Sequence, residues 1–398
     1  MNGNRKYVFL TPAIGNIGGS QMYIRNKVNF LKRNGWDVSV FYFQYFDILI
    51  DDLSEYQSGY INELRYGIQY LTSKQRERVL VKLQGLIGDY SDLVIESNMF
   101  RLSYWAELLA KNMNARHILA PLEEEIPKIS VPFVQYLEFK LKRRECLNST
   151  ETSLKRFFRS SYKEEYAEYI FPMDFCCSNV IDASIEHPLA LEKSDFNIMT
   201  IGRLEKPFVM TMFDEFRFFS LSHPEKLINV LIIGASPMGD KEEEIRRLFE
   251  KIETVRLYFM GFVFPIPTSY FANVDVAVSS ANSVMVSANQ GIPTIPVDMY
   301  DYYAMGIYGE TTENIFYRTD EPKIKISSLL EEVLIEKKYG RRVSDNCESD
   351  SAFCFYEQLK FIERCNKKKD YYDTTRLFSR FDNIVGNCKR YVHEFFKK

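Results

Sequence analysis

Short apolar runs alternate with amphipathic stretches from the start of this chain of 398 residues. The stretches at 21–33 and 101–113 repeat their apolar residues with the spacing of a helix. An apolar run, a helix and another apolar run form a βαβ unit, and such units build parallel sheets. The first part of the chain is therefore predicted to contain four buried strands: Tyr7–Leu10, Trp36–Phe43, Ser91–Glu96 and Ala115–Ala120.

A second series of strands and helices starts at residue 196. The segment Val180–Asp195 has mixed polarity and one proline, which is typical of a linker. Ahead of it, residues 131–169 are charged and helical, and 173–179 is expected to be a strand; residues 351–398 are rich in helical pattern. Two doubly wound α/β domains are therefore predicted. The second has expected strands Phe196–Gly202, Leu227–Gly234, Val255–Gly261, Val274–Ser279 and Ile292–Val297, and helices Met210–Leu221, Lys241–Lys251 and Ser283–Gln290.

Composition narrows the class of protein. The length exceeds what one core usually supports, and a net charge of −3 gives no general attraction to nucleic acid. Seven cysteines without a Cys-x-x-Cys pattern predict reduced thiols in a cytosol-like compartment. The beginning of the chain lacks a signal-peptide pattern, and no 18-residue apolar run occurs. We therefore expect a cytoplasmic protein that does not span a membrane.

The chemistry-bearing residues of the second half follow its strands. Gly-Arg-Leu-Glu-Lys comes after the first strand and places Arg203 and Lys206 at the edge of the sheet; the second strand ends at Gly234. After the fourth strand, small residues lead into a helix, with Ser283 as a plausible N-cap. Two cations and a helix start at one sheet edge suit a diphosphate. Each of these features has a plainer reading as solvated charges or an ordinary strand-to-helix turn.

These pieces together resemble the donor half of the GT-B glycosyltransferases, specifically the family 4-like enzymes of bacterial polysaccharide biosynthesis. The resemblance is strongest over residues 196–297, where Gly-Ile-Pro at 291–293 also matches. It implies an α/β fold of two Rossmann-like domains that face a cleft. Residues 1–185 would form the acceptor-side domain and 186–374 the donor domain, with a helix at 375–398 returning to the first domain.

The resemblance also assigns roles to residues of the donor half. Arg203 and Lys206 would contact the diphosphate, although the family's Lys usually stands two places later. The other matching positions would line the donor-binding site. Residues 262 and 263 would contact the base, and the backbone near 283–285 would bind a phosphate. The family's two glutamates are absent, and Val286 stands where the second would hold the ribose. The implied substrate-binding residues of this half are Gly234, Phe262, Val263, Asn282, Ser283, Val284 and Met285.

In the first half, the resemblance points to a glycine-rich turn and an acidic strand end. Gly18, Gly19 and Ser20 match a Gly-Gly loop that approaches the donor phosphates and the acceptor. Glu123 or Glu124 would orient the acceptor hydroxyl, although a solvated acidic loop is the plainer reading. His117 lies inside a strand and is interpreted as structural. The segment 139–159 interleaves seven Lys and Arg with Phe and Leu, which would suit peripheral contact with an anionic membrane or, more plainly, a solvated helix face.

The predicted function is glycosyl transfer from a UDP- or GDP-sugar to a glycan or a lipid-linked saccharide, with a retaining outcome implied by the family. No cofactor is expected. No two Asp are spaced by one residue and the four His are scattered, so a metal-independent reaction is predicted. Two alternatives stay open: a nucleotide-sugar 2-epimerase of the same fold, and a non-catalytic GT-B subunit that partners an active enzyme.

Overall fold

The chain forms two compact units. The computed structural model describes residues 5–122, 130–147, 151–171, 181–182, 184, 189–236, 239–343, 351–364, 370–378, 384–386, 388 and 390. The first unit comprises Met1–Asn16, Ser20–Cys176 and Asp350–Lys398, and the second comprises Ile17–Gly19 and Cys177–Ser349.

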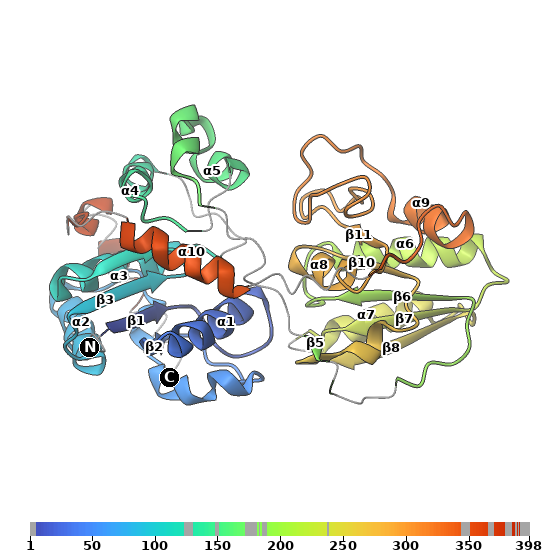
Figure 1. Ribbon diagram of the computed structural model, residues 1–398, viewed down its shortest axis with the longest axis horizontal. Helices are drawn as coiled ribbons and strands as arrows, with labels where there is room; N and C mark the ends of the chain where they lie inside the picture. Colours follow the sequence, from blue (N-terminus) through green and yellow to red (C-terminus); the bar gives the residue numbers. More distant parts are fainter. Residues whose placement is uncertain are drawn as a thin grey trace. The chain divides into compact units, whose positions relative to one another are not determined.

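The first unit is built on a four-stranded parallel sheet in the order β2-β1-β3-β4 (Figure 1). Apolar side chains of α2 and α3 pack with Val8 and Leu10 of β1 and with Ile95 of β3 in one buried cluster. Strands buried in this way read as the continuous apolar runs seen in the sequence. The elements are β1 (Arg5–Leu10), α1 (Gly19–Arg33), β2 (Asp37–Phe41), α2 (Ser73–Ile87), β3 (Asp92–Ser97), α3 (Phe100–Met113), β4 (Arg116–Leu119), α4 (Val131–Lys142) and α5 (Glu151–Phe158).

The end of the chain returns to this first unit at α10 (Ser351–Arg364), which lies across α1 (Figure 1). The ring of Phe355 packs against Tyr23 and Phe30 of α1, with centroids 5.8 and 5.7 Å apart. Further along, the Tyr371 hydroxyl donates to the carbonyl of Ala115 at 2.9 Å. The return therefore starts at residue 350, whereas the sequence placed residues up to 374 in the second domain; aromatic packing on α1 is the physical reason.

The second unit contains a five-stranded parallel sheet in the order β11-β10-β6-β7-β8. A short parallel pair, β5 with β9, draws the segment from residue 177 into this unit, earlier than the boundary expected at 186. The elements are β5 (Ile181–Asp182), β6 (Phe196–Ile201), α6 (Val209–Ser222), β7 (Ile228–Ile233), α7 (Asp240–Phe249), β8 (Val255–Gly261), β9 (Ile266–Pro267), β10 (Val276–Ser279), α8 (Asn282–Ala288), β11 (Thr294–Pro296) and α9 (Ile326–Leu330).

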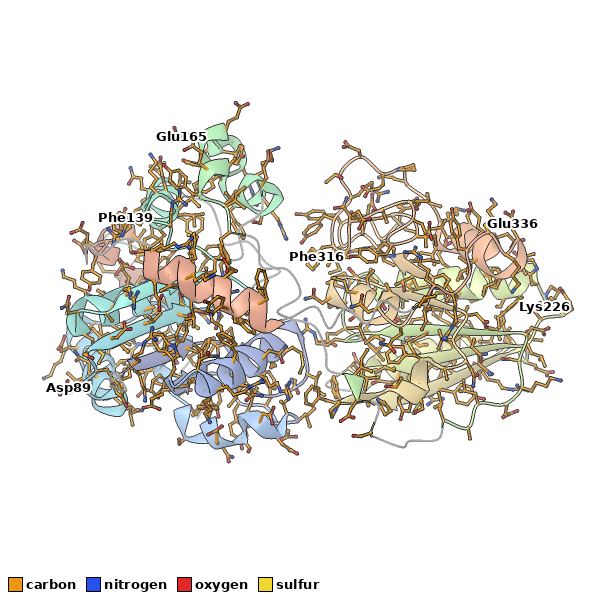
Figure 2. The ribbon with its side chains drawn as sticks, viewed as in Figure 1. Asp89, Phe139, Glu165, Lys226, Phe316 and Glu336 are labelled. Carbon is orange, nitrogen blue, oxygen red and sulfur yellow. The ribbon has the colours of Figure 1, made fainter. Side chains whose placement is uncertain are left out.

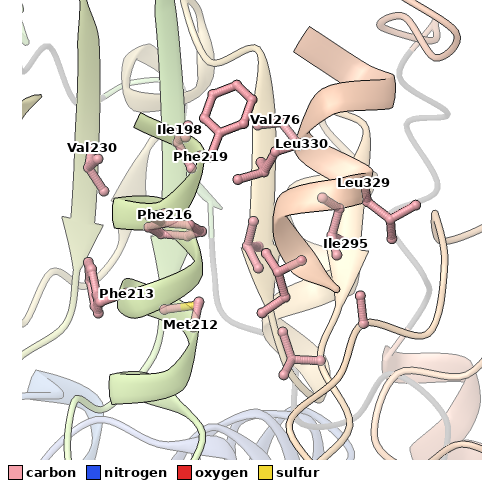
Figure 3. Packing of buried hydrophobic residues seen from close by; sticks show 14 of the residues in the cluster. Ile198, Met212, Phe213, Phe216, Phe219, Val230, Val276, Ile295, Leu329 and Leu330 are labelled. Atoms are coloured by element: carbon pink, nitrogen blue, oxygen red, sulfur yellow. The ribbon is translucent and has the colours of Figure 1, made fainter. Parts of the chain in front are cut away.

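Alternate residues of these strands face two separate cores. Ile198 of β6 and Val230 of β7 pack with Phe213 and Phe216 of α6 in the larger core, which α9 also covers (Figure 3). Met199 and its neighbours on the opposite face pack with residues 266–274 and with α8. Burial of both faces explains why each strand reads as an apolar run rather than an alternating one.

Three expectations from the sequence need comment. No helix among the described residues is long and apolar enough to cross a membrane. Cys354 on α10 is disulfide-bonded, whereas the cysteine pattern predicted reduced thiols. The strand expected at 173–179 lies outside the described residues.

Candidate functional site

The second sheet has a topological switch point between β6 and β10. From β6 the chain proceeds outward through β7 to β8, then crosses back to β10 and continues outward on the other side to β11. The loops that leave the carboxyl ends of β6 and β10 therefore turn away from each other, which opens the crevice where such sheets bind ligands. The two strand ends are joined directly, because the N–H of Ile201 donates to the hydroxyl of Ser279 at 3.2 Å.

The loop after β6 presents Arg203 and Lys206 at this switch point. Its apolar residues anchor it: Leu204 and Phe208 are buried in the core beneath α6, and the N–H of Leu204 donates to the carbonyl of Ala235 at 3.3 Å. Arg203, directly before Leu204, and Lys206, between the two anchors, are partly exposed. The alternation of anchors and cations explains how a short loop holds two positive charges at the edge of the sheet.

Arg203 forms an ion pair with Glu205, with 3.2 Å between Nη1 and Oε1. Both side chains are well exposed, at 42% and 34%. An exposed pair of this kind contributes at most about 1 kcal/mol, so exchanging Glu205 for a phosphate oxygen costs little.

The turn after β10 differs in detail from the expectation. The helix α8 begins at Asn282 with Ala281 at its N-cap, so Ser283 is not the cap residue. The N–H of Val284 donates to the carbonyl of Ala281 at 3.0 Å and is occupied. The side chains of Val284 and Met285 are buried, and α8 has only seven residues. The phosphate role predicted for 283–285 stays a prediction.

Gly234, predicted to bind substrate, has a packing role at the end of β7. Its φ is +133°, and a Cβ there would lie 1.9 Å from the carbonyl oxygen of Gly202. Its N–H donates to the carbonyl of Gly261 at 2.8 Å, so glycines end three neighbouring strands. The helix that follows, α7, has Asp240, Glu242 and Glu243 in its first turn, which would repel a phosphate.

A substitution at Gly234 should therefore act on stability. Gly234→Ala is expected to lower the free energy of unfolding by roughly 2–4 kcal/mol, because the new Cβ meets backbone and the φ is strained. Gly239→Ala is the matched control, since its φ of +69° is strained but no atom lies within 4 Å of its Cβ position. Calorimetric unfolding should show a clearly smaller loss for the control; equal losses would contradict the packing role.

The loop after β8 carries Phe262 and Val263, which the resemblance assigns to the base. Both side chains are partly exposed. Val263 packs against the smaller core of the second unit. The Gly261 that precedes them has φ +69° and open space around its Cβ position, so the chain turns there without crowding. The loop lies at the carboxyl end of the outermost strand, β8.

The predicted residues of the first half are placed only in part. Gly19 and Ser20 are the first residues of α1, and Gly18 directly precedes it. The glycine of this turn that packing requires is Gly15, where a Cβ would lie 2.5 Å from the backbone oxygen of Phe46. Glu123 and Glu124 lie outside the described residues. The ligand roles of Gly18, Gly19 and Ser20 stay predictions.

Two buried networks of charged groups in the first unit escaped the sequence analysis. Lys27 of α1 and Glu96 of β3 are fully buried, with Nζ and Oε2 2.5 Å apart. Glu96 also accepts hydrogen bonds from Tyr7 at 2.6 Å and from the amide of Asn98 at 2.8 Å. Burial lowers the pKa of Lys27 and Glu96 opposes this shift. Glu96 ends a strand that was predicted to be buried, but no local pattern in the sequence indicated that Lys27 is buried with it.

The second network contains His117, whose two ring nitrogens lie 2.9 Å from the Ser97 hydroxyl and 2.5 Å from Glu107. This order resembles a serine nucleophile with its base, but all three side chains are buried, and Lys140 neutralises Glu107 at 3.0 Å. Burial lowers the pKa of His117 and Lys140 lowers it further. Burial by itself would raise the pKa of Glu107, yet Lys140 and His117 outweigh it and hold the pKa at about 2. The network therefore has a structural role, as predicted for His117.

Several basic side chains of the segment 139–159 form ion pairs with carboxylates of the protein itself. Lys140 is buried between Glu107 and Glu145, and Arg143 pairs with Glu145 at 2.8 Å. Lys142 and Lys155 each pair with a carboxylate one helical turn earlier. Such pairing reduces the positive charge offered to an anionic surface, so peripheral membrane contact stays a prediction without structural support.

The chain is similar to known proteins in its three-dimensional structure and not in its sequence. No protein-family model matches the chain, and no curated protein matches its sequence. Among solved structures, Anabaena HepE in complex with UDP and glucose is 13% identical over 99% of each chain, with a TM-score of 0.53. A glycosyltransferase from Rickettsia africae is 11% identical over 91% of this chain and 96% of its own, with a TM-score of 0.57. The lipopolysaccharide outer core galactosyltransferase WaaB is 12% identical over 90% and 97%, with a TM-score of 0.52.

At these identities the likeness concerns architecture. The chain has the GT-B fold of glycosyltransferases, with two Rossmann-like α/β domains. The fold class predicted from the sequence is thereby confirmed.

Proposed function

We propose that this chain is a glycosyltransferase of the family 4 type that moves a sugar from a nucleotide to an acceptor. The observation that carries the proposal is the position of Arg203 and Lys206, which follow β6 at the switch point of the second sheet. Cations at that point of a Rossmann-like sheet suit the diphosphate of a nucleotide. The GT-B fold supplies the expectation that the nucleotide carries a sugar.

The donor class is proposed as UDP-sugar, with GDP-sugar as the second choice. HepE was crystallised with UDP and glucose, and WaaB is described as a galactosyltransferase. The acceptor is proposed to be a glycan or a lipid-linked saccharide, and the process to be surface polysaccharide or glycoconjugate synthesis in the cytoplasm. These finer assignments rest on the sequence resemblance.

The proposed reaction breaks the bond between the anomeric carbon and the β-phosphate oxygen and forms a bond from that carbon to an acceptor oxygen. The electron pair of the broken bond stays on the diphosphate, so negative charge grows there. Arg203 and Lys206 would stabilise this charge. The acceptor hydroxyl passes its proton to the oxygen of the departing diphosphate, and Glu123 is the residue proposed to orient that hydroxyl. Retention of anomeric configuration is proposed from the family alone.

Ligand binding followed by product analysis tests the proposal. The wild-type protein should be stabilised against thermal unfolding by UDP or GDP and by one or more of their sugars. Incubation with a saccharide acceptor should then yield a glycosylated acceptor and the free nucleotide. An epimerised nucleotide sugar would instead identify the 2-epimerase alternative. A protein that binds no nucleotide would point to the non-catalytic subunit.

Removal of metal should leave the activity nearly unchanged. The phosphate charge is assigned to Arg203 and Lys206, and the sequence contains no Asp-x-Asp pair that would hold a divalent ion. Transfer measured before and after treatment with EDTA should therefore agree within about twofold. Complete loss that Mg²⁺ or Mn²⁺ restores would show that a metal, and not these side chains, carries the phosphate charge.

A further inference from the structure

Three aromatic side chains pack together on the loop that follows β11, over residues 297–318. Tyr300 stacks on Tyr317 with ring centroids 4.7 Å apart and planes inclined by 30°, and Phe316 packs edge-on against Tyr317 at 4.4 Å. Tyr303 lies on the same loop and is 39% exposed. Tyr300 is 62% exposed, so it offers much of its ring surface to a ligand.

This aromatic loop is built to be rigid. The carboxylate of Asp298, which is buried, accepts hydrogen bonds from the backbone N–H groups of Tyr300 at 2.7 Å and Arg318 at 2.7 Å. The N–H of Met299 donates to the carbonyl of Phe316 at 3.2 Å, which joins the two sides of the loop. An ordered loop holds an exposed aromatic pair in place before any ligand arrives, so less entropy is lost on binding.

The same loop is tied to the switch point. The N–H of Ala281, directly before α8, donates at 2.6 Å to the carbonyl of Ile315, the residue before Phe316 (Figure 2). Ala281 has φ +58° and ψ −145°, a conformation that is costly for any residue with a Cβ and that recurs at ligand sites. Beside it, the hydroxyl of Ser280 is buried and has no hydrogen-bond partner among the described residues.

The distances across the sheet indicate which part of a ligand meets the aromatic loop. Neighbouring strands lie about 4.8 Å apart, so β11 is about 7 Å from the β6–β10 crevice and β8 is about 12 Å from it on the other side. A nucleotide sugar has one ring on one side of its diphosphate and two, ribose and base, on the other. The short side of the crevice therefore suits the single ring, and the long side suits the nucleoside.

We propose that Tyr300 and Tyr317 form a stacking platform for the sugar ring of the donor. The apolar C–H face of a pyranose packs on the negatively polarised face of an aromatic ring. The Ser280 hydroxyl is the buried group that meets a sugar hydroxyl. This inference rests on the proposed function, because it takes the diphosphate to lie at Arg203.

Binding measurements on Tyr300 variants test the platform. The probes are UDP and whichever of UDP-glucose, UDP-galactose and UDP-N-acetylglucosamine the wild type binds most tightly, measured by calorimetry. Tyr300→Ala should weaken binding of the UDP-sugar about tenfold and leave UDP within about twofold. Tyr300→Phe should restore most of the affinity, because the ring is kept. Phe218→Ala is the matched control, since Phe218 is 55% exposed on α6 of the same unit.

The outcomes separate the platform from the proposed function. Unchanged UDP-sugar binding in Tyr300→Ala, while Arg203→Ala loses UDP, would overturn the platform and leave the glycosyltransferase assignment standing. Equal weakening of UDP and UDP-sugar in Tyr300→Ala would also overturn it, because the nucleoside would then contact Tyr300. A wild type that binds neither these probes nor GDP and its sugars would overturn both.

Discussion

Arg203→Ala is expected to lower the transfer rate by about two orders of magnitude while the protein keeps its stability. Arg203 follows β6 at the switch point of the second sheet, where the diphosphate of the proposed reaction would gain negative charge. A charge-assisted contact that strengthens in the transition state contributes roughly 2–4 kcal/mol. The exposed pair with Glu205 adds little to folding, so its loss should shift the melting temperature by only a few degrees.

Steady-state kinetics with saturating donor and the melting temperature together check this prediction. Arg217→Ala is a suitable control, because Arg217 is an exposed arginine of α6 in the same unit, paired with Asp214 at 3.6 Å. Arg203→Lys should recover part of the rate, since it keeps the charge but not the bidentate geometry. Wild-type turnover in a folded Arg203→Ala variant would remove Arg203 from the site.

Lys27→Met is expected to destabilise the first unit by about 3–5 kcal/mol. The substitution leaves the carboxylate of Glu96 buried, with Tyr7 and Asn98 as its remaining hydrogen-bond donors among the described side chains. A buried charge that loses its partner carries the full cost of its desolvation. The double variant Lys27→Met, Glu96→Gln removes both charges and should recover a large part of the loss.

Tryptophan fluorescence during urea unfolding measures this effect, because both tryptophans of the chain, Trp36 and Trp105, are buried in the first unit. The signal therefore follows that unit and not the whole chain. Lys32→Met serves as the control for an exposed pair, since Lys32 contacts Glu55 with both side chains about half exposed. Its effect should stay below about 1 kcal/mol. A similarly small effect of Lys27→Met would show that the buried ion pair of Lys27 with Glu96 is not needed for stability.

Much of the fold could be predicted from the apolar pattern. The predicted strand Phe196–Gly202 corresponds to β6, and Leu227–Gly234 corresponds to β7, to within one residue at each end. Buried parallel strands have both faces covered, so their sequences are unmistakably apolar. The start of α8 was wrong by one residue, because a backbone conformation at Ala281, rather than a Ser283 cap, begins the helix.

The site could be predicted less completely. Arg203 and Lys206 were found because they follow a strand directly, and such positions lie at a known edge of the sheet. The ligand role of Gly234 stays a prediction, since a glycine at a strand end serves close backbone packing as well as ligand approach. The stacked pair Tyr300 and Tyr317 was missed, because 17 positions separate its members and only the folded loop brings them together.

The sequence by itself determined the α/β class, the two sets of strands and the cations after β6, since each depends on residues close together in the chain. Tertiary structure alone decided the strand order that creates the switch point between β6 and β10. It also decided the return of α10 to the first unit and the burial of Lys27 against Glu96. These features depend on contacts between distant segments, for which the local spacing of apolar and polar residues contains no signal.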